Sequence, residues 1–156
     1  MATHTLHPTL ISQANFKAGI PLEIPSAEAL QYPEKILQFG TGVLLRGLCD
    51  YFVDKANKQG VFKGRIVVVK STAKGGADAF QHQNNLFTHC IKGIDEGKEV
   101  EKYLVNGSIS RTINANTDWE HIIACASNPE MKIVLSNTTE VGIQYFAGDT
   151  LFEGCP

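Results

Sequence analysis

The stretch from residue 35 to residue 47 constrains the fold of this chain more than any other part of the sequence. It reads KILQFGTGVLLRG, a short apolar run that ends at Gly40-Thr41-Gly42 and passes directly into apolar side chains at helical spacing. A strand, a glycine turn and a helix in this order open a βαβ unit that binds a dinucleotide. Gly40 allows the tight turn, and Gly42 lets the backbone approach a pyrophosphate.

The predicted helix begins with Val43 and Leu44, whose amides are expected to point at the phosphates. Arg46 has the reach to bind a phosphate or a substrate carboxylate, although an arginine that faces solvent is the commoner outcome. Leu45 stands where the third glycine of the signature usually lies, which predicts a slightly larger spacing between helix and strand. The alternative is a glycine turn that binds nothing.

Length and composition fit one globular domain. The chain has 156 residues, of which 43% are hydrophobic and 19% charged. The formal net charge of −2 and the scattered basic residues argue against nucleic acid as a partner. The sequence contains no apolar run of about 20 residues and no secretory signal at its start, so we expect a cytoplasmic protein without a membrane partner. The four cysteines lie far apart, which favours reduced thiols.

The chain divides into a leading segment, residues 1–34, and a nucleotide-binding domain, residues 35–156. The leading segment contains several prolines and little periodicity. The domain is predicted to be α/β and Rossmann-like, with a mostly parallel sheet, helices on both faces and an inserted β-hairpin. The strands are expected at residues 35–39, 65–70 and 132–136, and the hairpin pairs residues 86–94 with residues 99–113 around the turn DEGK.

Two helices are predicted between these strands. The first spans residues 43–58, and its core-facing side is expected to consist of Val43, Leu44, Leu48, Tyr51, Phe52 and Ala56. The second runs to Ser127, with Thr117 as its hydroxyl cap and Glu120 as the carboxylate three residues on.

The end of the strand at residues 65–70 bears on cofactor choice. A carboxylate normally binds the ribose of NAD at this point, yet no Asp or Glu occurs between Asp54 and Asp78. The strand ends instead in Lys70-Ser71, which favours NADP or weak discrimination. The alternative is that Lys70 is a solvated strand end and that Ser71 or Thr72 alone binds the ribose.

Asn137 and Thr138 follow the last predicted strand and are expected beside the nicotinamide, because ligands lie at the carboxyl ends of the strands in this architecture. Turn capping by the same side chains is the alternative. His82, His89 and Cys90 lack the spacing of a metal site, so no metal is predicted. Cys90 and its neighbour His89 are expected to point to opposite faces of a strand, which argues against covalent catalysis.

Three separated segments carry a family resemblance. The sequence from ILQFGTGVLLRG to VVVKST, then LFTHCIKGIDEGKEVEKYLVNGSISRTINA, then KIVLSNTTEVGI resemble the amino-terminal domain of the tagaturonate reductase group within the mannitol dehydrogenase family of polyol-specific long-chain dehydrogenases. The resemblance covers roughly residues 35–143. In the wider family a phenylalanine-histidine-arginine stretch follows the glycine turn, and here only Arg46 of that stretch is retained.

The resemblance implies metal-independent hydride transfer with NAD, interconverting tagaturonate and altronate, and NADP stays open because of Lys70. The catalytic lysine and asparagines of the family lie in or near a carboxyl-terminal domain that this chain is expected to lack. We therefore assign no catalytic residue, expect the fragment to be inactive alone, and expect self-association through the face that the missing domain would cover. The alternatives are a mannonate-type or mannitol-type dehydrogenase of the same family and a non-catalytic nucleotide-sensing module.

Overall fold

A four-stranded parallel sheet forms the centre of the molecule. The computed structural model describes residues 22–71 and 81–138. The strand order is β6-β3-β2-β7. The strands span Glu34–Phe39 (β2), Arg65–Lys70 (β3), Ile109–Asn114 (β6) and Ile133–Ser136 (β7). Every described pair in this sheet is parallel, as predicted for a Rossmann-like fold.

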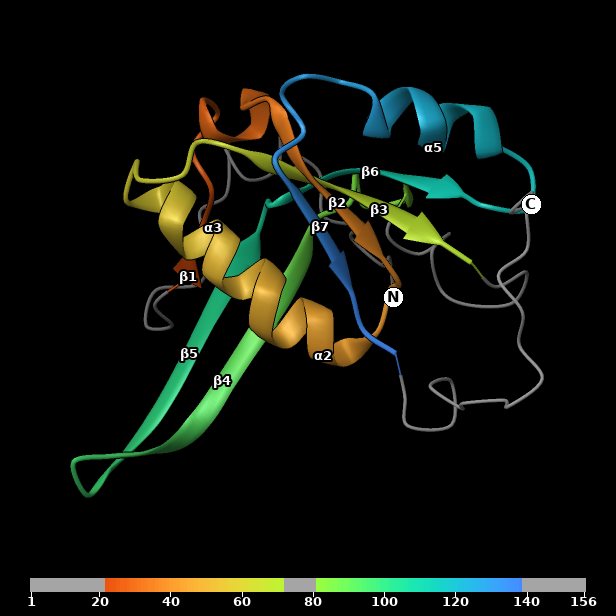
Figure 1. The fold of residues 1–156 in the computed structure, drawn as a ribbon. Coiled ribbons are helices and arrows are strands. Elements are labelled where there is room, and N and C mark those ends of the chain that lie inside the picture. The colour runs from red at the N-terminus through yellow and green to blue at the C-terminus, as the bar shows by residue number, and fades with distance from the viewer. Residues whose placement is uncertain (1–21, 72–80, 139–156) are drawn as a thin grey trace.

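Both faces of the sheet are covered by helices (Figure 1). Side chains of β3 alternate between the two faces: Val67 and Val69 pack with Ile122 of one helix, and Ile66 and Val68 pack on the opposite side. All four of these β3 side chains are buried. A strand buried on both sides needs a continuous β-branched run, which is what RIVVVK provides.

A second sheet holds the predicted β-hairpin, which extends away from the parallel sheet in Figure 1. Its strands are β4 (Phe87–Asp95) and β5 (Lys98–Asn106), and the short strand β1 (Leu22–Glu23) pairs with β5. Glu96 and Gly97 form the turn with φ of 48° and 78°, the backbone conformation that right-twisted hairpins favour. The inserted hairpin is confirmed.

The prediction that the hairpin continues to residue 113 is wrong. The chain leaves β5 at Asn106, and β6 runs parallel to β3 as a further strand of the central sheet. The alternating pattern of residues 99–113 is shared by both strands, so it does not reveal the break at Gly107 and Ser108. The Ile66 amide donates to the Ser108 carbonyl oxygen at 2.8 Å, which helps to set β6 beside β3.

The first helix is continuous from residue 43 to residue 58 but changes its winding. It consists of α2 (Val43–Leu45), a π-helical segment called η2 (Arg46–Asp50) and α3 (Tyr51–Lys58). The predicted apolar core face is wrong at four positions. The exposed fractions are 75% for Val43, 59% for Leu44, 50% for Leu48 and 55% for Phe52.

The buried face of this helix is largely polar. Asp50, Asp54 and Asn57 are at most 5% exposed. Asp54 accepts a hydrogen bond from the Gly107 amide at 2.9 Å, and Asn57 bonds both the amide and the carbonyl oxygen of Gly64. The helix therefore satisfies backbone groups of two connecting segments, which an apolar face would leave unpaired.

The remaining helices are short. The 3-10 helix η1 covers Ala29–Gln31, and α5 covers Trp119–Ala126. The predicted cap of α5 is wrong, because Asp118 is the N-cap residue and makes no side-chain capping bond. The Thr117 hydroxyl instead donates to the Asp118 carboxylate at 2.9 Å. Among the described helices, none has the length and apolar character needed to cross a membrane.

Candidate functional site

The parallel register brings the ends of four strands to one edge of the sheet. Phe39 of β2 lies beside Val69 of β3 and Ser136 of β7, and Lys70 lies beside Asn114 of β6. The segments that follow these strands therefore share the carboxyl edge, where ligands bind in open parallel sheets. The predicted site residues that follow or end the strands are Gly40, Thr41, Gly42, Lys70, Ser71, Asn137 and Thr138.

The turn at Gly40 requires glycine. Its φ of 113° is a conformation that other residues rarely adopt, and its amide donates to the Val69 carbonyl oxygen at 2.9 Å. A Cβ atom at this position would lie 3.4 Å from Cδ1 of Leu45. The buried leucine therefore packs against the turn from the helix side.

Gly42 is glycine for a different reason. Its backbone is extended, with φ of −64° and ψ of 156°, and a Cβ atom there would meet no described atom within 4 Å. The protein itself therefore does not exclude a side chain at Gly42. An open approach to the backbone, followed directly by a helix start, is the geometry that a phosphate group needs.

The helix start offers backbone donors. Gly42 is the N-cap residue and supplies no side-chain capping bond, and the first helical bond runs from the Arg46 amide to the Gly42 carbonyl oxygen at 3.2 Å. The amides of Val43 and Leu44 precede that bond, and both side chains are largely exposed. Arg46 itself is partly buried, so the interpretation of a solvent-facing arginine does not hold.

Lys70 is the last residue of β3 and lies at the carboxyl edge of the sheet. It is 7% exposed, so its interpretation as a solvated strand end is wrong. The described part of the chain supplies no carboxylate within salt-bridge distance of its ammonium group. Ser71 is exposed, and its carbonyl oxygen accepts a hydrogen bond from Asn116 Nδ2 at 3.4 Å.

Sequence reasoning missed the contribution of β6 to this edge. Asn114 ends that strand, and its Oδ1 accepts hydrogen bonds from the amide and the side chain of Asn116 at 3.0 and 3.3 Å. The sequence signal for the end of this strand was the turn-forming run NANT, residues 114–117, which follows an alternating pattern. Asn137 and Thr138 are exposed after β7, and the residues that follow them lie outside the described part of the chain.

A polar cluster lies directly behind the glycine turn. Gln38 and Asp50 are fully buried, and Gln38 donates from Nε2 to the Gly40 carbonyl oxygen over 3.4 Å. Burial raises the pKa of the Asp50 carboxyl to about 7, although Gln38 and the positive charge of Arg46 act in the opposite direction. We call Gln38, Arg46 and Asp50 the turn cluster.

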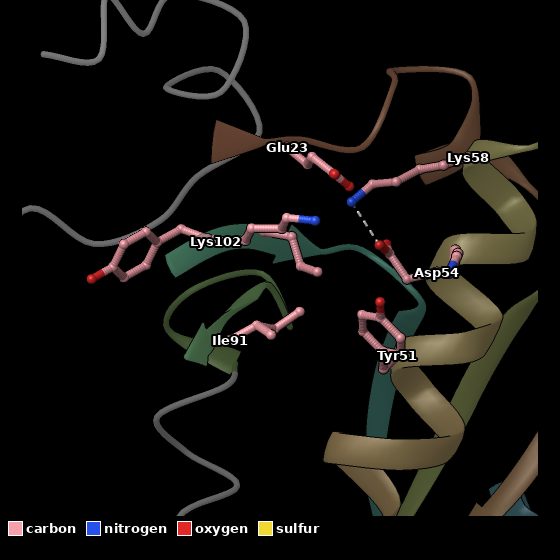
Figure 2. Close-up of a pocket in the computed structure, with 9 residues that line it drawn as sticks. Glu23, Tyr51, Asp54, Lys58, Ile91 and Lys102 are labelled. Carbon is pink, nitrogen blue, oxygen red and sulfur yellow. Dashed lines mark ion pairs between the residues drawn. The ribbon is translucent and has the colours of Figure 1, made fainter. Parts of the chain in front are cut away.

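A pocket of about 160 Å³ lies away from the carboxyl edge, between α3 and the hairpin. Figure 2 shows Tyr51 and Asp54 of α3 facing Ile91 and Lys102 of the hairpin. Asp54 pairs with Lys58 at 2.7 Å, and Lys58 also donates to the Val105 carbonyl oxygen. These contacts attach the hairpin to the helix.

His89 and Cys90 point in different directions. His89 is partly buried, and its Nε2 lies 3.1 Å from Asn106 Nδ2. Burial lowers the pKa of the His89 imidazole. Cys90 is exposed on the other face of β4. Their opposite orientations agree with the alternation of a strand.

Comparison with known proteins identifies relatives over most of the chain. The altronate oxidoreductase of Halalkalibacterium halodurans is 41% identical over 116 residues, which cover 74% of this chain and 23% of that protein. The altronate oxidoreductase of Klebsiella pneumoniae subsp. pneumoniae is 39% identical over 127 residues, which cover 81% of this chain and 26% of that protein. The altronate oxidoreductase of Bacillus subtilis is 38% identical over 113 residues, which cover 72% of this chain and 24% of that protein. The chain thus spans about a quarter of the length of these relatives.

Solved structures with the same fold include two polyol dehydrogenases. The Pseudomonas fluorescens mannitol 2-dehydrogenase, in a ternary complex with NAD and D-mannitol, matches with a TM-score of 0.70 at 20% identity, over 86% of this chain and 26% of that chain. A D-sorbitol dehydrogenase in substrate-free form matches with a TM-score of 0.71 at 21% identity, over 88% of this chain and 28% of that chain. No protein-family model matches the chain. The resemblance and the fold class predicted from the sequence are both confirmed.

Proposed function

We propose, from the similarity to the altronate oxidoreductases, that this chain is the nucleotide-binding domain of an NAD-dependent oxidoreductase that interconverts tagaturonate and altronate. The observation that carries the proposal is the Gly40 turn, with its positive φ and its place at the carboxyl edge of a parallel sheet. The mannitol 2-dehydrogenase of the same fold was solved with NAD, which supports a nicotinamide cofactor here.

Each part of the cofactor has a proposed contact. Thr41, Gly42 and the amides of Val43 and Leu44 would hold the pyrophosphate, together with Arg46. Lys70 and Ser71 would bind the adenosine ribose, and Asn137 and Thr138 would bind the nicotinamide half. The cofactor would supply hydride chemistry, accepting a hydride as NAD+ and donating one as NADH. The residues of this chain bind the cofactor and orient it, and no metal takes part.

Turnover is proposed to need more of the protein than this domain. Hydride transfer requires a sugar acid held against the nicotinamide and a positioned general base. The relatives are several times longer than this chain, so both requirements are assigned to a carboxyl-terminal domain outside residues 35–156. We propose that residues 1–34 are a leading segment, that the isolated domain is inactive, and that the protein is cytoplasmic.

NAD is proposed over NADP because the similarity is to tagaturonate reductases. The buried ammonium group of Lys70 favours the 2′-phosphate of NADP on physical grounds, so NADP is the second candidate. A mannitol-type substrate is the second candidate for the reaction, since structures of mannitol and sorbitol dehydrogenases share the fold. The altronate oxidoreductases are closer in sequence, which favours the sugar acid.

The test is a calorimetric titration of the folded chain with NADH and, separately, with NADPH. Gly42→Trp places an indole in the open approach to the turn and is expected to abolish binding. Gly93→Trp is the matched control, because a Cβ atom at Gly93 also meets no described atom within 4 Å but lies on the hairpin. Absence of binding, or equal binding by both variants, would refute the proposed site. Preference for NADPH would refute the choice of NAD.

A further inference from the structure

The turn cluster contains three buried acceptor atoms: both carboxylate oxygens of Asp50 and the Oε1 atom of Gln38. None of these three atoms has a hydrogen bond of normal geometry within the described part of the chain, and none is accessible to solvent. A buried acceptor without a donor is costly, and a buried carboxylate without one is more costly still. The cluster therefore has a strong physical reason to hold one additional proton.

A proton on Asp50 resolves both problems. It removes the buried negative charge and converts one carboxylate oxygen into a donor. The side chain of Gln38 lies within hydrogen-bonding reach of the Asp50 carboxyl, and its Oε1 atom has no donor within the described part of the chain, so we assign Oε1 as the acceptor of that proton. The Nε2 atom of Gln38 then stays available to the Gly40 carbonyl oxygen.

The same cluster contacts the glycine turn from both sides. Gln38 lies on β2 two residues before Gly40 and bonds its carbonyl oxygen. Asp50 lies on the helix that begins after Gly42, one helical turn beyond Arg46. A change of charge at Asp50 therefore acts on the two elements that hold the turn in place.

We propose that Asp50 is a positioning residue for the phosphate-binding turn, and that binding of a dinucleotide is coupled to uptake of a proton by Asp50. The proposal rests on the proposed function. A pyrophosphate at the turn brings negative charge toward the cluster, and negative charge disfavours the ionised carboxylate. Coupling is reciprocal, so a protonated Asp50 must strengthen dinucleotide binding as much as the dinucleotide favours protonation.

Other charged and titratable groups lie around Asp50. Arg46 lies one helical turn before it on the same helix, and the positive charge of Arg46 lowers the pKa of Asp50. Asp54, the next carboxylate on the helix, is paired with Lys58 at 2.7 Å. His89 on β4 reaches Asp50 through Asn106, which donates to the Asp50 carbonyl oxygen at 2.9 Å and lies 3.1 Å from His89 Nε2. Burial lowers the pKa of the His89 imidazole, whereas burial raises the pKa of the Asp50 carboxyl.

The experiment is a calorimetric titration of the chain with NAD at about pH 6 and about pH 8.5, in two buffers of different ionisation enthalpy. Binding is expected to take up a proton between these limits and to be tighter at the lower pH. A rise of one unit in the pKa of Asp50 on binding corresponds to about tenfold in affinity. Asp50→Asn is expected to keep the low-pH affinity at both pH values and to take up no proton. Asp118→Asn, at a carboxylate on α5 whose side chain is 45% exposed, is expected to behave as the unmodified chain.

A second measurement does not depend on the variant. The carboxyl carbon of Asp50 is titrated by NMR in the unmodified chain, with and without saturating NAD. The expected result is titration near neutral pH in the free chain and at higher pH in the bound chain. Titration at the ordinary value of 3.8, or no change on binding, would overturn the proposal.

Failure of the proton coupling and failure of the proposed cofactor site give different results. If NAD binds without proton uptake, the coupling to Asp50 is wrong and the proposed function stands. If NAD binds the folded chain at neither pH, the proposed cofactor site fails and the coupling fails with it.

Discussion

Asn106 donates a hydrogen bond from Nδ2 to the carbonyl oxygen of Asp50 at 2.9 Å, across 56 positions of the sequence. The bond joins the end of β5 to the π-helical segment that follows the glycine turn. The Oδ1 atom of Asn106 accepts bonds from both the amide and the hydroxyl of Ser108. One fully buried side chain thus connects the hairpin, the start of β6 and the first helix.

Asn106→Leu is therefore expected to destabilise the domain by about 2–4 kcal/mol, because it leaves several buried polar groups without partners. The free energy of unfolding, measured by chemical denaturation, checks this. Asn116→Ala, at an exposed asparagine, is the control and is expected to change the free energy of unfolding by about 0.5 kcal/mol or less. Equal effects of the two substitutions would show that the Asn106 bonds do not stabilise the fold.

The stability of the domain is expected to depend on pH through Asp50. Its pKa rises from 3.8 in the unfolded chain to about 7 in the fold. The folded state therefore binds the proton more tightly, and its advantage is fully present below pH 3.8 and is lost as the pH rises through about 7. Asp50→Asn should remove this loss and raise the free energy of unfolding by up to a few kcal/mol (about 1.4 per pKa unit) above the folded pKa.

Denaturation of both proteins across the pH range measures this difference. His89 acts with the opposite sign, because its lowered pKa contributes stability above its ordinary value of 6.5 that is lost as the pH falls. That contribution is common to both proteins and cancels in the difference. Parallel stability curves would contradict the raised pKa of Asp50.

Gly40→Ala is expected to destabilise the fold by about 1–3 kcal/mol, because φ of 113° is strained for alanine and the new methyl group meets Leu45. Gly47→Ala is the matched control, since a Cβ atom there meets no described atom within 4 Å and its φ is not positive. That control is expected to be neutral or to stabilise by about 0.5–1 kcal/mol. Thermal unfolding of the two variants separates the outcomes, and a neutral Gly40→Ala would show that the turn tolerates other residues.

Self-association is expected through the exposed side of the first helix. Leu48 and Phe52 are 50% and 55% exposed and continue the apolar surface that begins at Val43 and Leu44. Leu48→Lys combined with Phe52→Lys should shift the chain toward monomer in sedimentation velocity. Val61→Lys removes a loop side chain that is 76% exposed, and it should leave association unchanged. Identical sedimentation of all three proteins would argue against this surface as the interface.

Much of the architecture could be predicted because its signals are local. The β-branched run RIVVVK identifies a strand buried on both faces, and DEGK identifies the turn of the hairpin. The glycine turn identifies itself by the abrupt change from strand to helix spacing. In each case the residues that form the structure are neighbours in the chain, so their order alone carries the information.

The tertiary structure decided what the polar residues do. Nothing local marks Asp50, Asp54 and Asn57 as buried. The side chains of Asp54 and Asn57 bond backbone groups of Gly107 and Gly64, and Asn106 bonds the backbone carbonyl oxygen of Asp50. The assignment of β6 to the central sheet likewise depends on pairing with β3 more than 40 positions away. The sequence by itself determined the strand, turn and helix types, whereas the packing of segments distant in the chain determined which face of the first helix is buried. That burial, which no local pattern encodes, raises the pKa of the Asp50 carboxyl.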